Sequence, residues 1–204
     1  TEALAAVCIC CSNHNDKDSI GYPIPCTEFV IRDEKGKPVK DGEIGEITLK
    51  GPSVMVGYFN DEKSTKEAVK DGYLYTGDLG YKKNGFIFYE ARKKRVVKVS
   101  GVGVFPTEIE KLIDSMHEVK ECCAIQIPDP IMQHAIKVFV VASYFDAEGM
   151  KQQILDICRK YLIKWAVPKE IEFVDSLPYT MLGKIDFNKL QKQEDEKRNT
   201  SSVK

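Results

Sequence analysis

The sequence predicts an α+β fold, in which short strands and amphipathic helices pack around small sheets. Segments rich in β-branched or alternating apolar residues recur along the chain, and Gly, Pro and Asp residues separate them. In the second half, segments with apolar residues at helical spacing alternate with such strands. Apolar residues make up 43% of the chain and charged residues 30%, which is typical of a globular protein. We therefore expect the second half to form a small sheet flanked by helices.

Composition and charge exclude several classes of protein. The 30 basic residues nearly balance the 31 acidic ones, so the net charge gives no reason to expect a nucleic-acid partner. The longest uncharged apolar run, residues 3–11, is too short to be a transmembrane segment, and it lacks the basic flank of a signal peptide. Seven cysteines, with two adjacent pairs, make a poor disulfide framework. Together these features indicate a cytoplasmic protein.

The first half of the chain is expected to consist mostly of strands. We predict strands at residues 6–11, 27–32 and 45–50, a turn at 33–36 and a short helix at 61–69. In the first strand, the thiols are expected to be buried as small hydrophobic groups. The alternative is a metal site, but the spacing of its candidate ligands matches none of the usual zinc patterns. These candidates are Cys8, Cys10, Cys11, His14 and Cys26.

The centre of the chain combines glycine-rich stretches with a cluster of cations. Strand-like segments at 86–89 and 96–99 flank a basic turn at 92–95, and the surrounding glycines predict a loop at residues 76–78. A second glycine-rich stretch, residues 101–103, is expected to loosen the backbone. A carboxylate can accept hydrogen bonds from two sugar hydroxyls, and Arg and Lys side chains can bind an anion, so this region suits a polyol next to a phosphate. Local physics alone favours a simpler alternative, a hairpin with a solvated basic turn.

The second half of the chain is expected to alternate helices and strands. We predict helices at residues 107–117 and 148–164, and strands at 121–127, 137–145 and 170–174. Thr107 and Glu110 form a candidate capping box at the start of the first of these helices. From residue 189 onward the chain is polar and lacks an apolar face, so we expect residues 191–204 to be a disordered tail.

Five segments, in order, resemble the core motifs of the adenylate-forming (AMP-binding) enzymes. They are Tyr75-Thr76-Gly77-Asp78-Leu79, Arg92-x-Lys94, Lys98-Val99-Ser100-Gly101, Phe105-Pro106-x-Glu108-Ile109-Glu110 and Leu177-Pro178-Tyr179-Thr180-x-x-Gly183-Lys184-Ile185-Asp186. The resemblance covers nearly all of the chain. It implies that residues 1–93 are the C-terminal end of a large adenylation domain and form a small β-barrel-like subdomain. Residues 94–190 would be the mobile C-terminal domain of that family.

The resemblance assigns nucleotide-binding roles to residues of the first half. Asp78 would accept both ribose hydroxyls, Arg92 would contact the ribose and the phosphates, and Tyr75 would lie on or near the adenine. Thr1 and Glu2 match the end of a motif that places Thr near the α-phosphate and Glu on magnesium. Without the resemblance, Asp78 would cap its own loop, Arg92 would be a surface charge and Tyr75 a packed aromatic residue.

The resemblance assigns chemistry and motion to the second half. Lys184 matches the catalytic lysine of adenylation, which stabilises the charge on the α-phosphate as pyrophosphate leaves. Lys94 occupies the hinge position about which the C-terminal domain swings. The loop formed by Ser100, Gly101 and Val102 would line the tunnel that admits the pantetheine arm of CoA.

The function implied by the resemblance is that of an AMP-forming acyl-CoA synthetase, most similar to the fatty-acid members. Such an enzyme uses ATP with Mg²⁺ to join a carboxylic acid to CoA through an acyl-AMP, and it releases AMP and pyrophosphate. The phosphate loop and most of the acid pocket would belong to an upstream part of the same enzyme, so this chain alone is expected to be inactive. Two alternatives stay open: an adenylation domain that loads a carrier protein, and a non-catalytic module that binds a nucleotide or a partner. Arg95 stands beside the hinge, where the family usually has an acidic residue.

Overall fold

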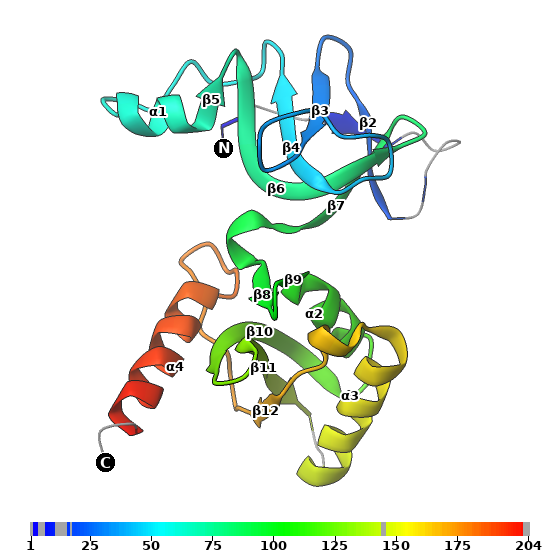
Figure 1. Ribbon diagram of the computed structural model, residues 1–204, viewed down its shortest axis with the longest axis vertical. Helices are drawn as coiled ribbons and strands as arrows, with labels where there is room; N and C mark the ends of the chain where they lie inside the picture. Colours follow the sequence, from blue (N-terminus) through cyan, green and yellow to red (C-terminus); the bar gives the residue numbers. More distant parts are fainter. Residues whose placement is uncertain (1, 4–6, 11–15, 17, 144–145, 202–204) are drawn as a thin grey trace. The chain divides into compact units, whose positions relative to one another are not determined.

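A computed structural model describes residues 2–3, 7–10, 16, 18–143 and 146–201 of the chain (Figure 1). The chain divides into two compact units, Thr1–Lys94 and Arg95–Lys204. The expected domain boundary, between residues 93 and 94, lies one residue before this division. Both units contain helices and strands, which confirms the predicted α+β class. Among the described residues, every helix is too short or too polar to cross a membrane.

The first unit is built on a curved antiparallel sheet. In spatial order its main path runs β1-β2-β7-β6-β4-β3, and β5 pairs with β6. The strands are β1 (Cys8–Ile9), β2 (Ser19–Pro23), β3 (Glu28–Arg32), β4 (Gly45–Lys50), β5 (Val69–Lys70), β6 (Tyr73–Lys83) and β7 (Phe86–Arg92). Figure 1 shows that β6 bends strongly along its length, so the sheet curls into the expected barrel-like form.

The core of the first unit packs against this sheet. Its buried residues come from four different strands: Phe29, Ile31, Ile47, Leu49, Leu74 and Ile87. The one helix of the unit's described residues, α1 (Glu62–Ala68), begins at Asp61, whose carboxylate accepts the Ser64 N–H at 2.9 Å. A side-chain acceptor at this position satisfies one of the free N–H groups of the first turn. The helix predicted at residues 61–69 is therefore confirmed.

Two strand predictions in the first half need correction. The strand expected at residues 6–11 is reduced to β1, in which Ile9 is 51% exposed, and the following Cys10 is exposed too. The reason is position, because β1 lies at the edge of the sheet and pairs only with β2. Residues 4–6 and 11–15, which include Cys11 and His14, lie outside the described part of the chain.

The hairpin around the basic turn is also wrong. The strand β7 pairs with β6 and β2, whereas β8 (Val97–Val99) pairs with β9 (Val102–Val104). The basic residues between β7 and β8 form a short 3-10 helix, η1 (Lys93–Arg95). The two strands cannot pair because each belongs to a different core: Ile87 of β7 packs in the first unit and Val97 of β8 in the second.

The second unit has three layers. Its central sheet pairs β10 (Val119–Asp129) with β11 (Gln133–Ala142) antiparallel, and β11 with β12 (Glu170–Phe173) parallel. The helices α2 (Pro106–Asp114) and α3 (Ala147–Tyr161) and the short η2 (Lys164–Ala166) pack on one face of this sheet. The helix α4 (Phe187–Ser201) packs on the other face (Figure 1). The helices and strands predicted here are confirmed, with ends that differ by a few residues.

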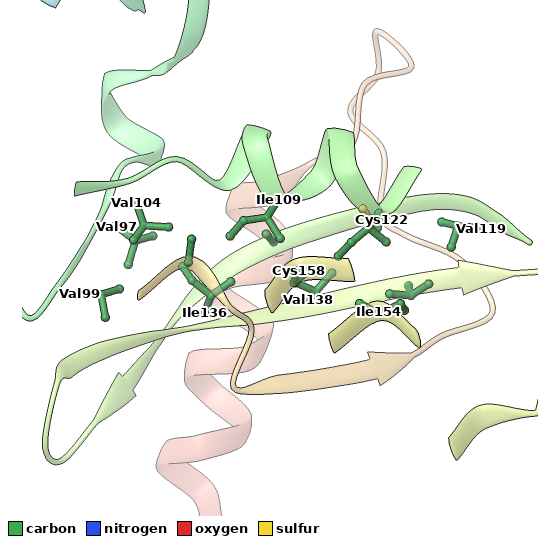
Figure 2. Packing of buried hydrophobic residues seen from close by; sticks show 14 of the residues in the cluster. Val97, Val99, Val104, Ile109, Val119, Cys122, Ile136, Val138, Ile154 and Cys158 are labelled. Carbon is green, nitrogen blue, oxygen red and sulfur yellow. The ribbon is translucent and has the colours of Figure 1, made fainter. Parts of the chain in front are cut away.

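Both faces of the central sheet are buried, and this explains the long apolar runs in its strands. Cys122 and Ala124 point to the core beneath α2 and α3, whereas Cys123 and Ile125 point to the core beneath α4. Figure 2 shows Val138 of β11 beside Ile154 and Cys158 of α3 in the first of these cores. Strands covered on both sides are apolar at nearly every position, so their composition predicts them well.

The predicted capping box of α2 is wrong. The helix begins one residue earlier than expected, with Phe105 at the N-cap and Pro106 as its first residue. Proline suits this position because it has no N–H to satisfy and its φ is already helical. Thr107 therefore lies inside the helix, and the Glu110 carboxylate contacts Arg95 and the Ala124 N–H instead.

The polar tail expected at residues 191–204 is helical through Ser201 in the structure. Leu190, which precedes this segment in the same helix α4, packs in the apolar core, but most of the attachment of α4 is ionic. The buried Lys137 Nζ lies 2.7 Å from Oε2 of Glu172 in β12 and 2.9 Å from Oε2 of Glu194 in α4. Burial opposes ionisation of Glu194, but hydrogen bonds from Lys137 and Arg198 outweigh it and hold the pKa below its ordinary value. The pattern of apolar residues does not predict this helix, because ion pairs attach it to the sheet.

We predict that Lys137→Ala lowers the free energy of unfolding of the second unit by about 3 kcal/mol, because it leaves a buried carboxylate without its main partner. The sequence has a single tryptophan, Trp165, which packs against the core of this unit and reports its unfolding by fluorescence in urea. The matched control is Lys192→Ala, which removes an exposed ion pair from α4 and should cost less than about 1 kcal/mol. Equal urea midpoints for the two variants would contradict the ionic docking of α4.

Candidate functional site

Residues 76–78, expected to form a loop, are a bulge inside the long strand β6. On either side of it, Leu79 pairs with Glu46 and Tyr75 with Thr48, so three residues stand opposite Ile47 alone. The Thr76 hydroxyl donates to the Ile47 carbonyl at 2.8 Å and accepts the Asp78 N–H at 3.0 Å. Gly77 has a φ of +72°, a left-handed conformation that glycine adopts without strain. The glycines predicted a loop at this point, but strand β6 continues through it.

Asp78, the last residue of the bulge, lies beside the Arg92 guanidinium of β7. The two residues are cross-strand partners, and Arg92 Nη1 lies 3.0 Å from Asp78 Oδ1. The same nitrogen donates to the Thr76 carbonyl at 2.7 Å. Burial raises the pKa of the Asp78 carboxyl, and the nearby Arg92 charge opposes that rise. A half-buried carboxylate next to an exposed guanidinium can bind a diol and an anion side by side.

Tyr75 lies on the same strand, three residues before Asp78. Its ring is partly buried, and the Lys70 ammonium lies 4.9 Å from the ring centroid. A cation over an aromatic face is a favourable contact of about 0.5–1 kcal/mol at exposed sites. The ring therefore already has a partner within its own unit, the Lys70 ammonium. A ligand ring stacked on this face of Tyr75 would have to displace that ammonium.

Glu2 is the other candidate from the first unit that the structure describes, since Thr1 lies outside the described residues. Its carboxylate accepts the Tyr58 hydroxyl at 2.9 Å, and this hydrogen bond lowers the pKa of Glu2. The Arg92 charge lowers it further, so Glu2 belongs to the same electrostatic neighbourhood as Asp78. An exposed, ionised carboxylate fits one position of Mg²⁺, which commonly takes one or two carboxylates and fills its shell with phosphate oxygens and water.

The described residues contain no cluster of three or more His, Cys, Asp or Glu side chains that could hold a metal ion. Of the candidate thiols in the described residues, Cys10 and Cys26 are exposed and Cys8 is half-buried. Burial raises the pKa of Cys8 to about 11, which disfavours the thiolate that zinc requires. Any Mg²⁺ at Glu2 would therefore depend on a bound nucleotide for most of its ligands.

Glu46 is a site residue that sequence reasoning missed. Its buried carboxylate accepts the Gly77 N–H of the bulge at 3.1 Å and lies 2.8 Å from Lys93 Nζ. Lys94, the predicted hinge residue, follows directly, is exposed and ends the first unit. The only sequence signal for Glu46 is a carboxylate among the buried positions of β4, and nothing local reveals its partners.

The predicted CoA loop is a tight turn. Ser100 and Gly101 join β8 to β9 with φ values of +48° and +82°, the pattern of a two-residue type I′ hairpin turn. The Ser100 N–H donates to the Met132 carbonyl at 3.1 Å, which holds the turn against the loop between β10 and β11. Val102 is exposed at the end of this turn. The glycines therefore close a defined hairpin, whereas we expected them to loosen the backbone.

Asp129 fixes the loop on which this turn rests. Its buried carboxylate accepts the N–H groups of Ile131 at 2.8 Å and Met132 at 2.7 Å, and Lys169 Nζ lies 2.5 Å away. The Lys169 hydrogen bond and the two N–H donors lower the pKa of Asp129 to about 2. The carboxylate is therefore ionised, and the loop keeps its shape, down to strongly acidic pH.

Lys184 lies on a loop that we call the lysine loop, residues 178–186. The Thr180 N–H donates to the Lys184 carbonyl at 2.7 Å, and the Asp186 N–H donates to the Pro178 carbonyl at 2.7 Å. These two bonds close the loop into a small hairpin, with Tyr179 hydrogen-bonded to Glu121 of β10. The Lys184 side chain is exposed, and it belongs to the second unit, whereas Asp78 and Arg92 belong to the first.

A carboxylate–guanidinium pair in one unit and an exposed lysine loop in the other, joined at a short basic turn, are the features that the adenylate-forming motifs of the sequence predict. Comparison with known families agrees with this class. The AMP-binding enzyme family matches residues 1–59, and the AMP-binding enzyme C-terminal domain matches residues 108–184. The chain belongs to the AMP-binding enzyme family.

Relatives with curated names are similar over most of the chain. A long-chain-fatty-acid–CoA ligase of Yersinia pestis is 40% identical over 86% of this chain and 31% of its own length. One from Haemophilus influenzae is 38% identical over 97% of this chain and 35% of its own length. Among solved structures, o-succinylbenzoate coenzyme A synthetase from Bacillus subtilis, in complex with AMP, is 28% identical with a TM-score of 0.85, over 94% of this chain and 39% of that chain. The chain spans about a third of the length of these curated relatives.

We predict that Asp129→Ala speeds hydrogen exchange of the Ile131, Met132 and Ser100 amides about tenfold, because the loop loses a charged acceptor. The control is Asp156→Ala, which removes an exposed carboxylate from α3 and should leave these amides unchanged.

In an NMR titration of the unmodified chain, Asp129 should titrate at about pH 2. Because this folded pKa is below the ordinary value, its stabilisation is present above about pH 4 and is lost as the pH falls through about 2. Titration near pH 4 would contradict the contacts described.

Proposed function

We propose that this chain is the C-terminal part of an AMP-forming acyl-CoA synthetase. In the first half-reaction, a carboxylate attacks the α-phosphate of ATP, and acyl-AMP forms as pyrophosphate leaves. In the second, the thiol of CoA attacks the acyl carbon, and acyl-CoA forms as AMP leaves. The observation that carries the proposal is the Asp78–Arg92 pair on a bulge of a curved sheet, within a chain of this family.

The nucleotide is proposed to bind at this pair. Asp78 accepts the two ribose hydroxyls, which would return to its desolvated carboxylate some of the hydrogen bonds that burial removed. Arg92 contacts the ribose and phosphates, and Tyr75 contacts the adenine. Thr1 would lie near the α-phosphate. Glu2 would hold Mg²⁺, which neutralises phosphate charge when it is bound.

Lys184 is proposed as the catalytic residue of the first half-reaction. As the carboxylate attacks and pyrophosphate leaves, negative charge builds on the nonbridging oxygens of the α-phosphate, next to the carboxylate that attacks it. An ammonium placed between them stabilises this charge more in the transition state than in the ground state. The exposed side chain at the end of a closed loop can enter a site formed by another part of the enzyme.

Motion at Lys94 is proposed to exchange the lysine loop for the turn at Ser100, Gly101 and Val102. In this scheme residues 1–93 belong to the large domain and residues 94–190 to the mobile domain. The turn would line the tunnel through which the thiol of CoA reaches the acyl-AMP. A rigid turn, held to the Met132 carbonyl, suits this use because it presents an unchanging wall to the pantetheine arm.

The acid is proposed to be a fatty acid, because the relatives named above are long-chain-fatty-acid–CoA ligases. The phosphate loop and most of the acid pocket would belong to the upstream part of the same enzyme. An adenylation domain that loads a carrier protein differs in its acceptor thiol, and a non-catalytic module would make no acyl-AMP. Both rivals are therefore separated by measuring the two half-reactions.

We predict that this chain alone releases no pyrophosphate, whereas a longer form with residues upstream of Thr1 does so with ATP, CoA and a fatty acid. The measurement is pyrophosphate release with a panel of fatty and aromatic acids, with and without CoA. Acyl-AMP formation without transfer to CoA would favour a carrier protein as the acceptor. No acyl-AMP from any acid in the longer form would contradict the proposal and favour a binding module.

We predict that Lys184→Ala in the longer form lowers the rate of acyl-AMP formation by about 10²–10³-fold, because a charge aimed at the transition state is lost. Thioester formation from supplied acyl-AMP and CoA should change much less. The matched control is Lys189→Ala, an exposed lysine at the start of α4, which should leave both rates unchanged. Equal losses in the two half-reactions would contradict the role given to Lys184.

A further inference from the structure

Two residues flank Lys94, and each is held by an ion pair inside a different unit. Lys93 Nζ lies 2.8 Å from Glu46 Oε2 in the first unit. Arg95 Nη2 lies 2.6 Å from Glu110 Oε1 in the second unit, and Arg95 Nη1 donates to Glu110 Oε2 at 3.1 Å. The side chain of Lys94 between them is exposed. The chain therefore passes from one unit to the other over a single residue.

The contacts of Lys93 lead directly to the bulge. We call Lys93 and Glu46 the Lys93 anchor. The second oxygen of the Glu46 carboxylate accepts the Gly77 N–H at 3.1 Å, and Gly77 precedes Asp78. The Glu46 side chain is only 10% exposed, whereas that of Lys93 is 48% exposed, so water competes less for the carboxylate than for the ammonium. A displacement of Lys93 would therefore reach the backbone of the proposed ribose site through one carboxylate.

The contacts of Arg95 hold it to three elements of the second unit. Glu110 belongs to α2, and both side chains of the pair are largely buried, with 17% and 14% exposed. Arg95 also donates to the Ala124 carbonyl of β10 at 3.2 Å. Its guanidinium lies 5.0 Å from the centroid of the Phe187 ring at the start of α4. We call these four residues the Arg95 anchor.

The Arg95 anchor leads directly to the lysine loop. Phe187 follows Asp186, whose N–H closes the loop at the Pro178 carbonyl at 2.7 Å. The Asp186 carboxylate accepts the Lys189 N–H at 3.0 Å and thereby starts α4. The ring on which Arg95 stacks is therefore fixed to the end of the loop that carries Lys184. Only arginine can supply the forked hydrogen bonds and the flat stacking surface together.

We propose that Lys93 and Arg95 are positioning residues: they confine rotation to Lys94, and they transmit it to the bulge and to the lysine loop. The inference rests on the proposed function, because it assumes that Lys184 acts on a nucleotide held at Asp78. It gives a physical role to the arginine that stands where the family usually has an acidic residue. With both flanking residues anchored, a change in the backbone angles of Lys94 alone redirects the lysine loop.

The first test measures motion in this chain, without any activity. In ¹⁵N relaxation dispersion, the Lys94 amide should show exchange on the μs–ms timescale of a hinge rotation, and the Lys93 and Arg95 amides should have order parameters of about 0.85, like rigid backbone. Glu46→Gln should lower the order parameter at Lys93, and Glu110→Gln the order parameter at Arg95. The matched controls Glu43→Gln and Glu108→Gln, exposed residues close in sequence to Glu46 and Glu110, should change neither. No exchange at Lys94, or no response to the variants, would overturn the inference.

The second test measures positioning in the longer form of the enzyme. Glu110→Gln should lower kcat for acyl-AMP formation at least about tenfold and leave KM for ATP unchanged, because the nucleotide binds in the other unit. Glu108→Gln should leave both unchanged. If Glu110→Gln fails to fold, as judged by Trp165 fluorescence, Phe187→Leu removes the stacking contact while keeping an apolar side chain against the core, and it should lower kcat about threefold.

The outcomes separate this inference from the proposed function. Loss of acyl-AMP formation in Lys184→Ala, together with normal kcat in the folded anchor variants, would overturn the inference and leave the proposed function in place. Normal acyl-AMP formation in Lys184→Ala would overturn both. A loss of kcat with an equal rise in KM for ATP would indicate general damage to the enzyme, and it too would overturn the inference.

Discussion

The candidate site of the first unit depends on the bulge in β6. Three residues opposite one force the strand to bend, and the strand resumes its pairing on both sides. The bulge gives the Thr76 carbonyl to the Arg92 guanidinium and the Gly77 N–H to the Glu46 carboxylate. Asp78 and Arg92 lie directly opposite each other on neighbouring strands, so their side chains share one face of the sheet and can pair. The bulge thus adds backbone partners beside a cross-strand ion pair.

The second unit was largely predictable from sequence because both faces of its sheet are buried. Such strands are apolar at nearly every position, as at Cys122, Cys123, Ala124 and Ile125, and their signal survives whatever packs on them. The first unit was harder. Glycines mark the ends of strands in most contexts, as Gly72 does before β6, and only the partners β4 and β7 reveal that β6 runs through Gly77 and Gly80. Short edge strands such as β1 carry little signal of either kind.

The candidate site was predictable where its residues lie within a motif and unpredictable where they meet through the fold. Asp78, Arg92 and Lys184 each stand in a recognisable run of sequence. Glu46 meets Gly77 from 31 residues away and Lys93 from 47 residues away. Arg95 was noticed only as a departure, and its partners Glu110 and Phe187 became visible only once the chain was folded. Contacts of this range leave no local pattern.

The ionic attachment of α4 has a consequence for behaviour on heating. Three cations and three carboxylates, namely Lys137, Lys197, Arg198, Glu170, Glu172 and Glu194, join the helix to β11 and β12. The cost of removing water from charged groups falls as temperature rises, whereas apolar stabilisation levels off. The attachment of α4 to the sheet should therefore weaken less with warming than the packing of α2 and α3 on the opposite face. The two faces of one sheet would then differ in thermal behaviour, and the side next to the lysine loop would be the more heat-resistant.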